Sequence, residues 1–304
     1  SKKEKVDIIH AHSTFFCGIS AKITGVFLSK PVIYEVRSLW EERQKDSTSK
    51  IQRYSAEVIT KFETFSMKIS DRIIVINKNL LENVRNRNIK NNKISVIPNA
   101  VNLVRIEDKV NKNIITLNTS NYITFGYIGN ISNIEGIIDL CKVFQELENE
   151  NINNKLLIYG QGPELNNVKE FVKLNDLKNV RIMGSIQNSD IYKAFEKIDI
   201  IINPRVKSKI TDTVTPLKPL EAMGYKKLVI ASDVGGMKEL ITHNETGLLY
   251  SAGNNLKLKE LIKNVIQDSK KYIHIIDNAY EYVKNEKSWH ANAISYFDIY
   301  KGLK

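Results

Sequence analysis

The sequence has little cysteine and no long apolar run: only Cys17 and Cys141 occur among 304 residues. Two thiols without metal or redox spacing exclude a disulfide-stapled scaffold, and we expect both to pack as small buried side chains. No apolar run approaches the length that crosses a bilayer, and the opening SKKEKVDIIHAH lacks the apolar core of a signal peptide. These absences predict a cytoplasmic chain.

The charge balance is strongly positive, with a formal net charge of +11. Such an excess favours an anionic partner, such as a nucleic acid, a membrane surface or a phosphate-bearing substrate. The lysines are spread along the chain, and no basic stripe with interleaved aromatic residues occurs. We therefore rank a solvated surface first, an anionic membrane surface second and nucleic acid last.

Short apolar runs alternate with segments of helical spacing along most of the chain. This alternation is typical of parallel sheets with helices on both faces, so the predicted class is α/β. A polar, turn-rich segment at 103–121 predicts a hinge between two doubly wound sheets. We expect strands at 6–9, 31–36, 72–76 and 94–97 before the hinge, and at 123–128, 155–159, 180–183, 198–202 and 228–231 after it.

Polar residues follow the first two expected strands. His10 and His12 come just past the first strand, and Arg37, Glu41 and Glu42 come just past the second. The carboxyl ends of parallel strands are where open sheets bind their ligands. Arg37 is therefore a candidate for binding an anionic group, although a salt bridge to the nearby glutamates is an equally good interpretation.

The most informative stretch is 203–240, NPRVKSKITDTVTPLKPLEAMGYKKLVIASDVGGMKEL. A basic loop precedes a helix that we expect over 220–225. Backbone amides at a helix start, the helix dipole and a lysine such as Lys218 form a typical phosphate site. Glu221 would repel phosphate, but its carboxylate can accept hydrogen bonds from two hydroxyls of a ribose.

The wording VTPLKPLEAM, followed by VIASDVGGMKELI and TGLLY, resembles the donor-binding region of family four glycosyltransferases, closest to members of exopolysaccharide and exosortase systems. The resemblance covers nearly the whole chain. It implies the GT-B fold, in which two Rossmann-like domains face a cleft. It also implies retaining transfer from a nucleotide-sugar donor, a UDP-sugar by family frequency, to a glycan or lipid-linked acceptor in cell-surface polysaccharide synthesis. With the nucleotide-sugar as co-substrate, the implied transfer reaction needs no cofactor and no metal ion.

The resemblance assigns roles to matching positions. Donor binding falls to Gly129, Arg205, Lys209, Thr215, Pro216, Leu217, Lys218 and Glu221, and base binding to Gly160, Gly184, Ser185 and Ile186. His12 resembles the histidine that faces the donor sugar, and Arg37 lies on the acceptor side. We expect His10 and His12 to point in opposite directions from an extended strand, so that His10 packs inside or lines the rim.

Two departures from the family pattern bear on activity. Asn130 and Glu135 stand where typical members carry a phosphate-binding arginine and lysine, so Arg205, Lys209 and Lys218 would have to replace them. Glu221 fills the second place of a carboxylate pair, but Thr213 fills the first. We therefore assign a catalytic role to Asp212, the neighbour of Thr213 in the sequence. The second catalytic role goes to His12, on the resemblance described above.

The predicted domains are 1–112, 113–284 and a closing helix, 285–304, that crosses back to the first domain. The first domain has about four strands where the fold needs more, so its N-terminal portion is expected to be absent from the chain or supplied by another. Three alternatives remain open: a non-catalytic nucleotide-sugar-binding or assembly subunit, an epimerase or phosphorylase on the same fold, and, least favoured, a nucleic-acid binder.

Overall fold

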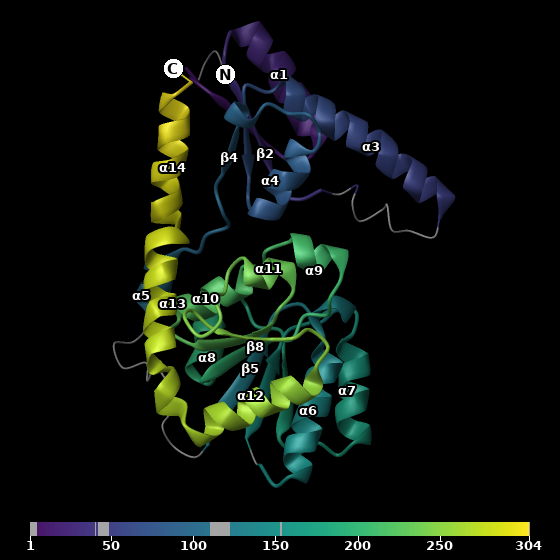
Figure 1. Cartoon of the computed structure of the whole chain (residues 1–304), viewed down its shortest axis with the longest axis vertical. Coiled ribbons are helices and arrows are strands. Elements are labelled where there is room, and N and C mark those ends of the chain that lie inside the picture. The colour runs from purple at the N-terminus through teal and green to yellow at the C-terminus, as the bar shows by residue number, and fades with distance from the viewer. Residues whose placement is uncertain (1–4, 40, 42–48, 110–121, 153, 304) are drawn as a thin grey trace. The chain divides into compact units, whose positions relative to one another are not determined.

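The computed structural model describes residues 5–39, 41, 49–109, 122–152 and 154–303 (Figure 1). It divides into two compact units, which we call unit 1 (1–99 with 292–304) and unit 2 (100–291). The boundaries thus fall at 99/100 and 291/292, whereas the sequence predicted 112/113 and 284/285. The start of the expected hinge is a helix, α5 (Leu103–Lys109), whose buried Leu103 and Ile106 belong to the core of unit 2.

Unit 1 is built on a four-stranded parallel sheet in the order β1-β2-β3-β4. The histidines that we expected beyond the first strand lie within it, because β1 begins and ends three residues later than predicted. The strands are β1 (Ile9–His12), β2 (Val32–Val36), β3 (Arg72–Val75) and β4 (Ile94–Val96). The helices are α1 (Phe15–Leu28), α3 (Lys50–Ile69), α4 (Lys78–Arg85), η1 (Asn91–Lys93) and the end of α14 (Trp289–Lys301).

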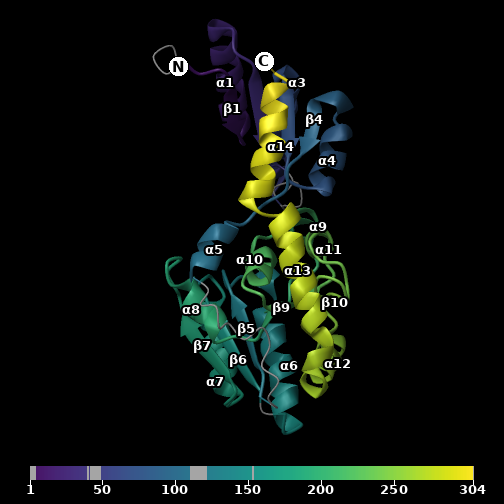
Figure 2. The same cartoon turned by 90° about the vertical axis from the view of Figure 1, so that its left-hand side faces the viewer.

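The two faces of this sheet are covered by segments from opposite ends of the chain. One face packs against α1, α3 and α4 through buried side chains such as Met67 and Leu80. On the other face Ile33, Ile74 and Ile97 pack against α14, which crosses the sheet in Figure 2. The closing helix therefore completes the core of unit 1.

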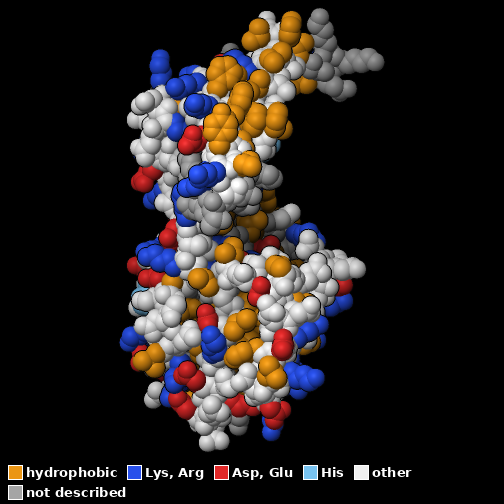
Figure 3. Space-filling view, turned by 90° about the vertical axis from the view of Figure 1, so that its right-hand side faces the viewer, with side chains coloured by type: hydrophobic (Ala, Val, Ile, Leu, Met, Phe, Trp, Pro, Cys, Tyr) orange, Lys and Arg blue, Asp and Glu red, His pale blue; other side chains and the backbone are white. Residues whose placement is uncertain are grey.

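Helix α1 carries apolar side chains on several sides. Phe16 and Phe27 are exposed, as are Phe62 and Phe65 on the neighbouring α3, and Figure 3 shows hydrophobic side chains gathered on unit 1. Cys17 also lies on the exposed side of α1, so the prediction that it is buried was wrong, whereas Cys141 is buried as expected. Within the described residues, no helix combines the length and the apolar character needed to cross a membrane.

Unit 2 contains a six-stranded parallel sheet in the order β10-β9-β8-β5-β6-β7. Its strands are β5 (Thr124–Ile128), β6 (Lys155–Tyr159), β7 (Val180–Gly184), β8 (Ile200–Asn203), β9 (Leu228–Ser232) and β10 (Leu248–Tyr250). Besides α5, its helices are η2 (Asn133–Glu135), α6 (Ile137–Asn149), α7 (Leu165–Leu174), α8 (Ile191–Glu196), α9 (Lys209–Thr213), α10 (Lys218–Gly224), α11 (Gly235–Lys238), α12 (Asn255–Gln267), η3 (Ser269–Tyr272) and α13 (Ile273–Glu286).

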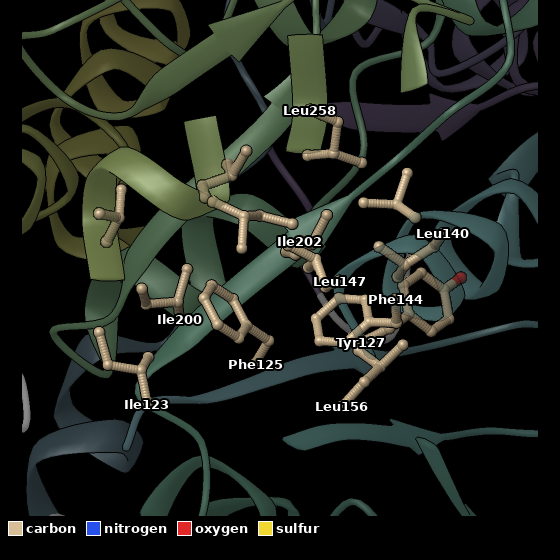
Figure 4. Packing of buried hydrophobic residues seen from close by; sticks show 14 of the residues in the cluster. Ile123, Phe125, Tyr127, Leu140, Phe144, Leu147, Leu156, Ile200, Ile202 and Leu258 are labelled. Atoms are coloured by element: carbon tan, nitrogen blue, oxygen red, sulfur yellow. The ribbon is translucent and has the colours of Figure 1, made fainter. Parts of the chain in front are cut away.

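Helices cover both faces of this sheet, as the alternation of apolar runs predicted. Figure 4 shows one face, where Phe125 and Ile200 of the sheet meet Phe144 of α6 and Leu258 of α12. The other face packs against α5, α8, α10, α11 and α13. Burying apolar area contributes roughly 25 cal/mol per Å², so the two layers hold the strands firmly in place. The loops that begin at the carboxyl ends of these strands are therefore fixed at their first residues.

Candidate functional site

The switch point of the sheet in unit 2 lies between β5 and β8. From β5 the chain proceeds to β6 and β7 on one side, while β8, β9 and β10 lie on the other. Loops that leave neighbouring strands in opposite directions open a crevice, which is where doubly wound sheets bind ligands. Gly129 follows β5 and Arg205 follows β8, so two predicted donor-binding residues lie at this point.

The predicted base-binding residues lie together on one side of the switch point. The Gly129 amide donates to the Tyr159 carbonyl at 2.9 Å, and the Gly160 amide donates to the Gly184 carbonyl at 2.8 Å, which joins the three strand ends. One cavity is lined there by Ile128, Gly129, Asn130, Tyr159, Gly160, Gln161, Ser185, Ile186, Asn188 and Ile191. The structure therefore places Gly160, Ser185 and Ile186 around a common space.

Lys218 reaches this region from the start of α10. Its ammonium donates to the Tyr127 hydroxyl at 2.7 Å, and that hydroxyl donates to the Asn130 carbonyl at 2.6 Å. A Cβ on Gly129 would lie 2.3 Å from Lys218 Cε, so the lysine crosses the loop after β5 only because that position is glycine. Burial lowers the pKa of Lys218, although Glu135 acts in the opposite direction. A cation thus stands at the switch point.

Glu135 contacts two cations of this site, the buried Arg205 and the partly buried Lys218. Its Oε2 lies 3.0 Å from Lys218 Nζ, and its Oε1 lies 3.3 Å from Arg205 Nη2. The side chains of Glu135 and Arg205 are each 7% exposed, and that of Lys218 is 23% exposed. We call these three residues the Glu135 cluster. The sequence predicted that Arg205, Lys209 and Lys218 replace the cations that typical family members carry near position 135. In the structure, Arg205 and Lys218 both contact Glu135.

Lys209 lies apart from this cluster, at the first position of α9, and its side chain is exposed. The sequence predicted a loop here, but the Ser208 side chain accepts from the Thr211 amide and caps a short helix. Lys207 is exposed as well. Arg205, one of the basic residues expected in this loop, reaches Glu135.

Asp212 and Thr213 turn in different directions from α9. Asp212 Oδ1 accepts from the Gly235 amide at 2.7 Å, while the Thr213 hydroxyl donates to the Lys209 carbonyl at 2.7 Å within the same helix. Asp212 therefore joins α9 to the loop after β9. Nothing in this arrangement tests its assigned catalytic role.

Glu221 opens onto a second cavity of unit 2, one helical turn from Lys218. Burial raises the pKa of Glu221, while Lys218 and Arg105 act to lower it. Around this cavity lie Ala100, Val101, Asn102, Arg105, Ile106, Lys109, Asn188, Ser189, Ile191, Tyr192, Leu217, Glu221, Tyr225 and Trp289. Thr215 is buried, Pro216 is half-buried and Leu217 is exposed. The carboxylate and Lys218 thus flank the start of α10, as the motif predicted.

In unit 1, the two histidines lie side by side. The rings of His10 and His12 are stacked, with centroids 4.8 Å apart and planes 8° from parallel. The prediction that they point in opposite directions was wrong, because side chains two residues apart on a strand share a face. His12 is 54% exposed, whereas His10 is 16% exposed and its Nδ1 lies 2.8 Å from the Tyr300 hydroxyl.

Glu35 lies directly opposite His12 in the pairing of β1 with β2. The side chain is fully buried, and Arg37 Nη1 donates to its Oε1 at 2.7 Å. Arg37 Nη2 also donates to the Asn99 side chain at 3.2 Å. One of the two interpretations of Arg37 was a salt bridge to Glu41 or Glu42, but Glu41 pairs with Arg87 at 2.8 Å, and Glu42 lies outside the described residues. Nothing here tests Arg37 as an acceptor-side group.

Sequence reasoning assigned no role to Glu35, Tyr127 or Tyr296, which the structure places among the candidate groups. A signal for Glu35 was present: strands buried on both faces are nearly continuous apolar runs, and VIYEV has a carboxylate inside one. Tyr127 and Tyr296 carried no comparable signal. Tyrosine is common in apolar runs, and its hydroxyl partner is set by the tertiary fold.

Comparison with protein-family models decides the family. The model described as "Glycosyl transferases group 1" matches residues 109–282, and the model described as "Glycosyltransferase Family 4" matches residues 1–105. The chain belongs to this glycosyltransferase family. Its fold is GT-B, with two Rossmann-like domains of parallel sheets, and the family shows it to be a transferase of sugars.

Named relatives span most of the chain. An uncharacterized glycosyltransferase of Methanocaldococcus jannaschii is 26% identical over 303 residues, 99% of this chain and 77% of the relative. The capsular polysaccharide biosynthesis glycosyltransferase CapM of Staphylococcus aureus is 24% identical over 295 residues, 94% of this chain and 74% of CapM. Anabaena HepE, solved in complex with UDP, has the same fold, with a TM-score of 0.79 at 17% identity over 99% of this chain and 80% of HepE.

Proposed function

We propose that this glycosyltransferase transfers a sugar, with retention of configuration, from a UDP-sugar to a glycan or lipid-linked acceptor in the synthesis of a cell-surface polysaccharide. One observation carries the proposal. At the switch point of unit 2, a partly buried cation on α10, Lys218, stands one turn from a partly buried carboxylate, Glu221. This is the pairing that a ribose joined to a diphosphate requires.

The assigned roles follow from the charges of the groups. Negative charge develops on the diphosphate as it leaves, and a fixed cation near it lowers the barrier most in a partly buried site. We assign this role to Lys218, supported by Arg205. Glu221 accepts from the ribose hydroxyls, and the cavity beside Gly160, Ser185 and Ile186 takes the base. In unit 1, His12 is proposed to stabilise charge on the reacting sugar.

Names of relatives support the finer parts of the proposal. HepE was solved with UDP, and CapM takes part in capsular polysaccharide biosynthesis. We propose that no cofactor and no metal are needed, because the Glu135 cluster supplies the cations that a metal would otherwise provide. The net charge of +11 further supports an anionic membrane surface as the place where a lipid-linked acceptor is met.

The first experiment is calorimetric titration of UDP into the protein. We expect Glu221→Gln to weaken UDP binding about 10-fold or more, since a charge-assisted hydrogen bond contributes about 1.5–3 kcal/mol. Glu245→Gln is the matched control, because Glu245 is an exposed glutamate of the same unit. Equal affinities for both variants and the unmodified protein would remove the donor site.

The second experiment is transfer from a panel of UDP-sugars to membrane lipid acceptors in the presence of a chelator. Proton NMR of the product gives the anomeric configuration. A product of inverted configuration, or activity that the chelator abolishes, would contradict the retaining or metal-independent part respectively.

A non-catalytic nucleotide-sugar-binding subunit is the second candidate. Glu135 favours it, because a carboxylate 3.0 Å from Lys218 opposes the negative charge that must develop on the leaving diphosphate during transfer. The two functions separate in one assay: a binding subunit retains UDP affinity but neither transfers nor hydrolyses any UDP-sugar.

A further inference from the structure

The most heavily contacted carboxylate in the described part of unit 1 is Glu35. Its two oxygens have four partners among the described residues. Oε1 lies 2.7 Å from Arg37 Nη1 and 3.5 Å from His12 Nδ1. Oε2 accepts from the Tyr296 hydroxyl at 2.8 Å and lies 3.2 Å from His10 Nε2. A fully buried carboxylate is costly unless it is paired, and here each oxygen has two partners.

We infer that Glu35 is a positioning residue for His12: its carboxylate holds the imidazole by Nδ1, so that Nε2 is presented to the substrate. The inference rests on the proposed function and names the group that sets the histidine's geometry. Because the partner of one ring nitrogen decides which nitrogen carries the proton, a carboxylate beside Nδ1 favours the tautomer with hydrogen on Nδ1.

The surroundings of Glu35 make it suited to this task. It lies on a buried strand, so its backbone is fixed by the sheet, and Arg37 and Tyr296 fix its side chain from two elements. His10 stacks on the His12 ring and is itself held by Tyr300. The His10 ring thus lies against one face of the His12 ring, and Glu35 Oε1 lies 3.5 Å from His12 Nδ1, while the His12 side chain stays 54% exposed.

The same atoms could instead hold a cation, since one ligand atom each from His10, His12 and Glu35 lies within 4.8 Å of the others. The guanidinium of Arg37, 2.7 Å from the same carboxylate, argues against this. A divalent cation would sit beside a fixed positive charge and would compete for an oxygen that already accepts a strong hydrogen bond.

The test compares Glu35→Gln with Glu63→Gln. Glu63 is also a buried glutamate of unit 1, and its carboxylate accepts from the Tyr34 hydroxyl at 2.6 Å and from the Phe15 amide at 2.8 Å, with no histidine among these partners. Both variants remove one buried charge. A change at His12 that appears in Glu35→Gln but not in Glu63→Gln therefore cannot come from the loss of a buried carboxylate as such.

The first readout is ¹⁵N NMR of the histidine side chains, with the His12 signals assigned through His12→Gln. In the unmodified protein we expect hydrogen on Nδ1 of His12. In Glu35→Gln the tautomer populations should move towards those of a free histidine, and in Glu63→Gln they should not move. An unchanged His12 tautomer in Glu35→Gln, or the same change in both variants, would overturn the inference.

The second readout is the kinetics of sugar transfer. Misplacing a reacting group by about 1 Å costs up to roughly 100-fold, so Glu35→Gln should lower kcat about 10- to 100-fold and leave KM for the donor within about twofold. Glu63→Gln should retain kcat. A tautomer change without a kcat change would overturn the positioning role in transfer.

Two outcomes separate this inference from the proposed function. Transfer activity that is absent from every variant, with the NMR change present, would refute the function but leave Glu35 as the group that orients His12. Stoichiometric zinc binding that shifts the His10 and His12 signals, and that Glu35→Gln abolishes, would overturn the inference in favour of a metal site.

Discussion

Glu35 in unit 1 and Glu135 in unit 2 are both buried glutamates that contact basic groups, yet the two differ in their partners. Glu35 contacts two histidines, an arginine and a tyrosine, and one of these histidines, His12, has a partly exposed side chain. Glu135 contacts the two cations, Lys218 and Arg205, that a diphosphate would need. The first carboxylate orients a ligand-facing group, whereas the second competes with the ligand for its cations.

This difference predicts opposite responses to removal of the charge. Losing Glu35 leaves histidines without orientation and should cost activity. Losing Glu135 leaves the positive charges of Lys218 and Arg205 without this carboxylate partner, so they can attract a diphosphate more strongly. Donor affinity should therefore not fall. The predictions below test that contrast, beginning with the largest expected effect.

The largest effect concerns acid stability of unit 1. Burial alone would raise the pKa of Glu35. Hydrogen bonds from His10 and Tyr296, together with the charges of His12 and Arg37, outweigh burial and lower this pKa from an ordinary 4.5 to about 2. Because the pKa is lower in the folded protein than in the unfolded chain, the ionised carboxylate stabilises the fold at pH values above the unfolded-state pKa. This contribution is lost as the pH falls towards 2. The stability advantage over Glu35→Gln should therefore shrink by about 3 kcal/mol between pH 6 and pH 2.

Hydrogen exchange of β2 amides, or urea unfolding at several pH values, measures this difference. Glu63 supplies a control of opposite sign, because burial raises its pKa. Its ionised form destabilises the fold, so the stability of the unmodified protein relative to Glu63→Gln should rise as the pH falls. The same pH dependence for both variants would contradict the description of Glu35.

The next effect is on donor binding. Lys218→Ala should weaken UDP binding about 30-fold, or about 2 kcal/mol, because a charge-assisted hydrogen bond to phosphate is lost. Lys207→Ala is the matched control, since Lys207 is exposed. Titration calorimetry measures both. Glu35→Gln should bind UDP like the unmodified protein, and equal losses in all three variants would show that the effect is not local to the Glu135 cluster.

A smaller effect of opposite sign is expected for Glu135→Gln. UDP affinity should rise several-fold, by about 1 kcal/mol, since a carboxylate next to the diphosphate cations is removed. Stability should fall by about 1–3 kcal/mol, because the buried Arg205 loses its charged partner. If UDP affinity falls as in Lys218→Ala, then Glu135 orients its cation as Glu35 orients His12, and the comparison between the two units fails.

The smallest effect is expected for Tyr127→Phe. This variant removes the hydroxyl that accepts from Lys218 at 2.7 Å but keeps the ring over which the ammonium lies at 4.8 Å. UDP affinity should fall only about two- to threefold, because the ring still holds the Lys218 ammonium and the variant removes no contact to the nucleotide itself. A loss as large as that of Lys218→Ala would make Tyr127 a principal part of the site.

The alternation of apolar runs was enough to predict both sheets and the class of fold, because strands buried on both faces differ sharply from the helices between them. The motif around Lys218 and Glu221 was equally readable, since both residues lie on one short helix. The error at His10 was of another kind. The period of two along a strand already placed His10 and His12 on one face, and the structure confirms that.

What the sequence could not give were the partners of the buried charges. Glu135 and Lys218 meet because α10 and the loop after β5 reach the same edge of the sheet, which depends on strand order. Glu35 and Tyr296 meet only because α14 returns to unit 1. Contacts between distant segments follow from topology, so composition and spacing cannot reveal them.

The position of α14 has a consequence for how the chain is made. Residues 100–291 form a unit whose segments are contiguous, so it can fold as soon as it leaves the ribosome. Unit 1 is translated earlier, but Ile33, Ile74 and Ile97 stay uncovered until residues 292–304 arrive. The unit that is synthesised first therefore matures last, and a premature stop codon shortly before Tyr296 would deprive β2 of its helix while sparing unit 2.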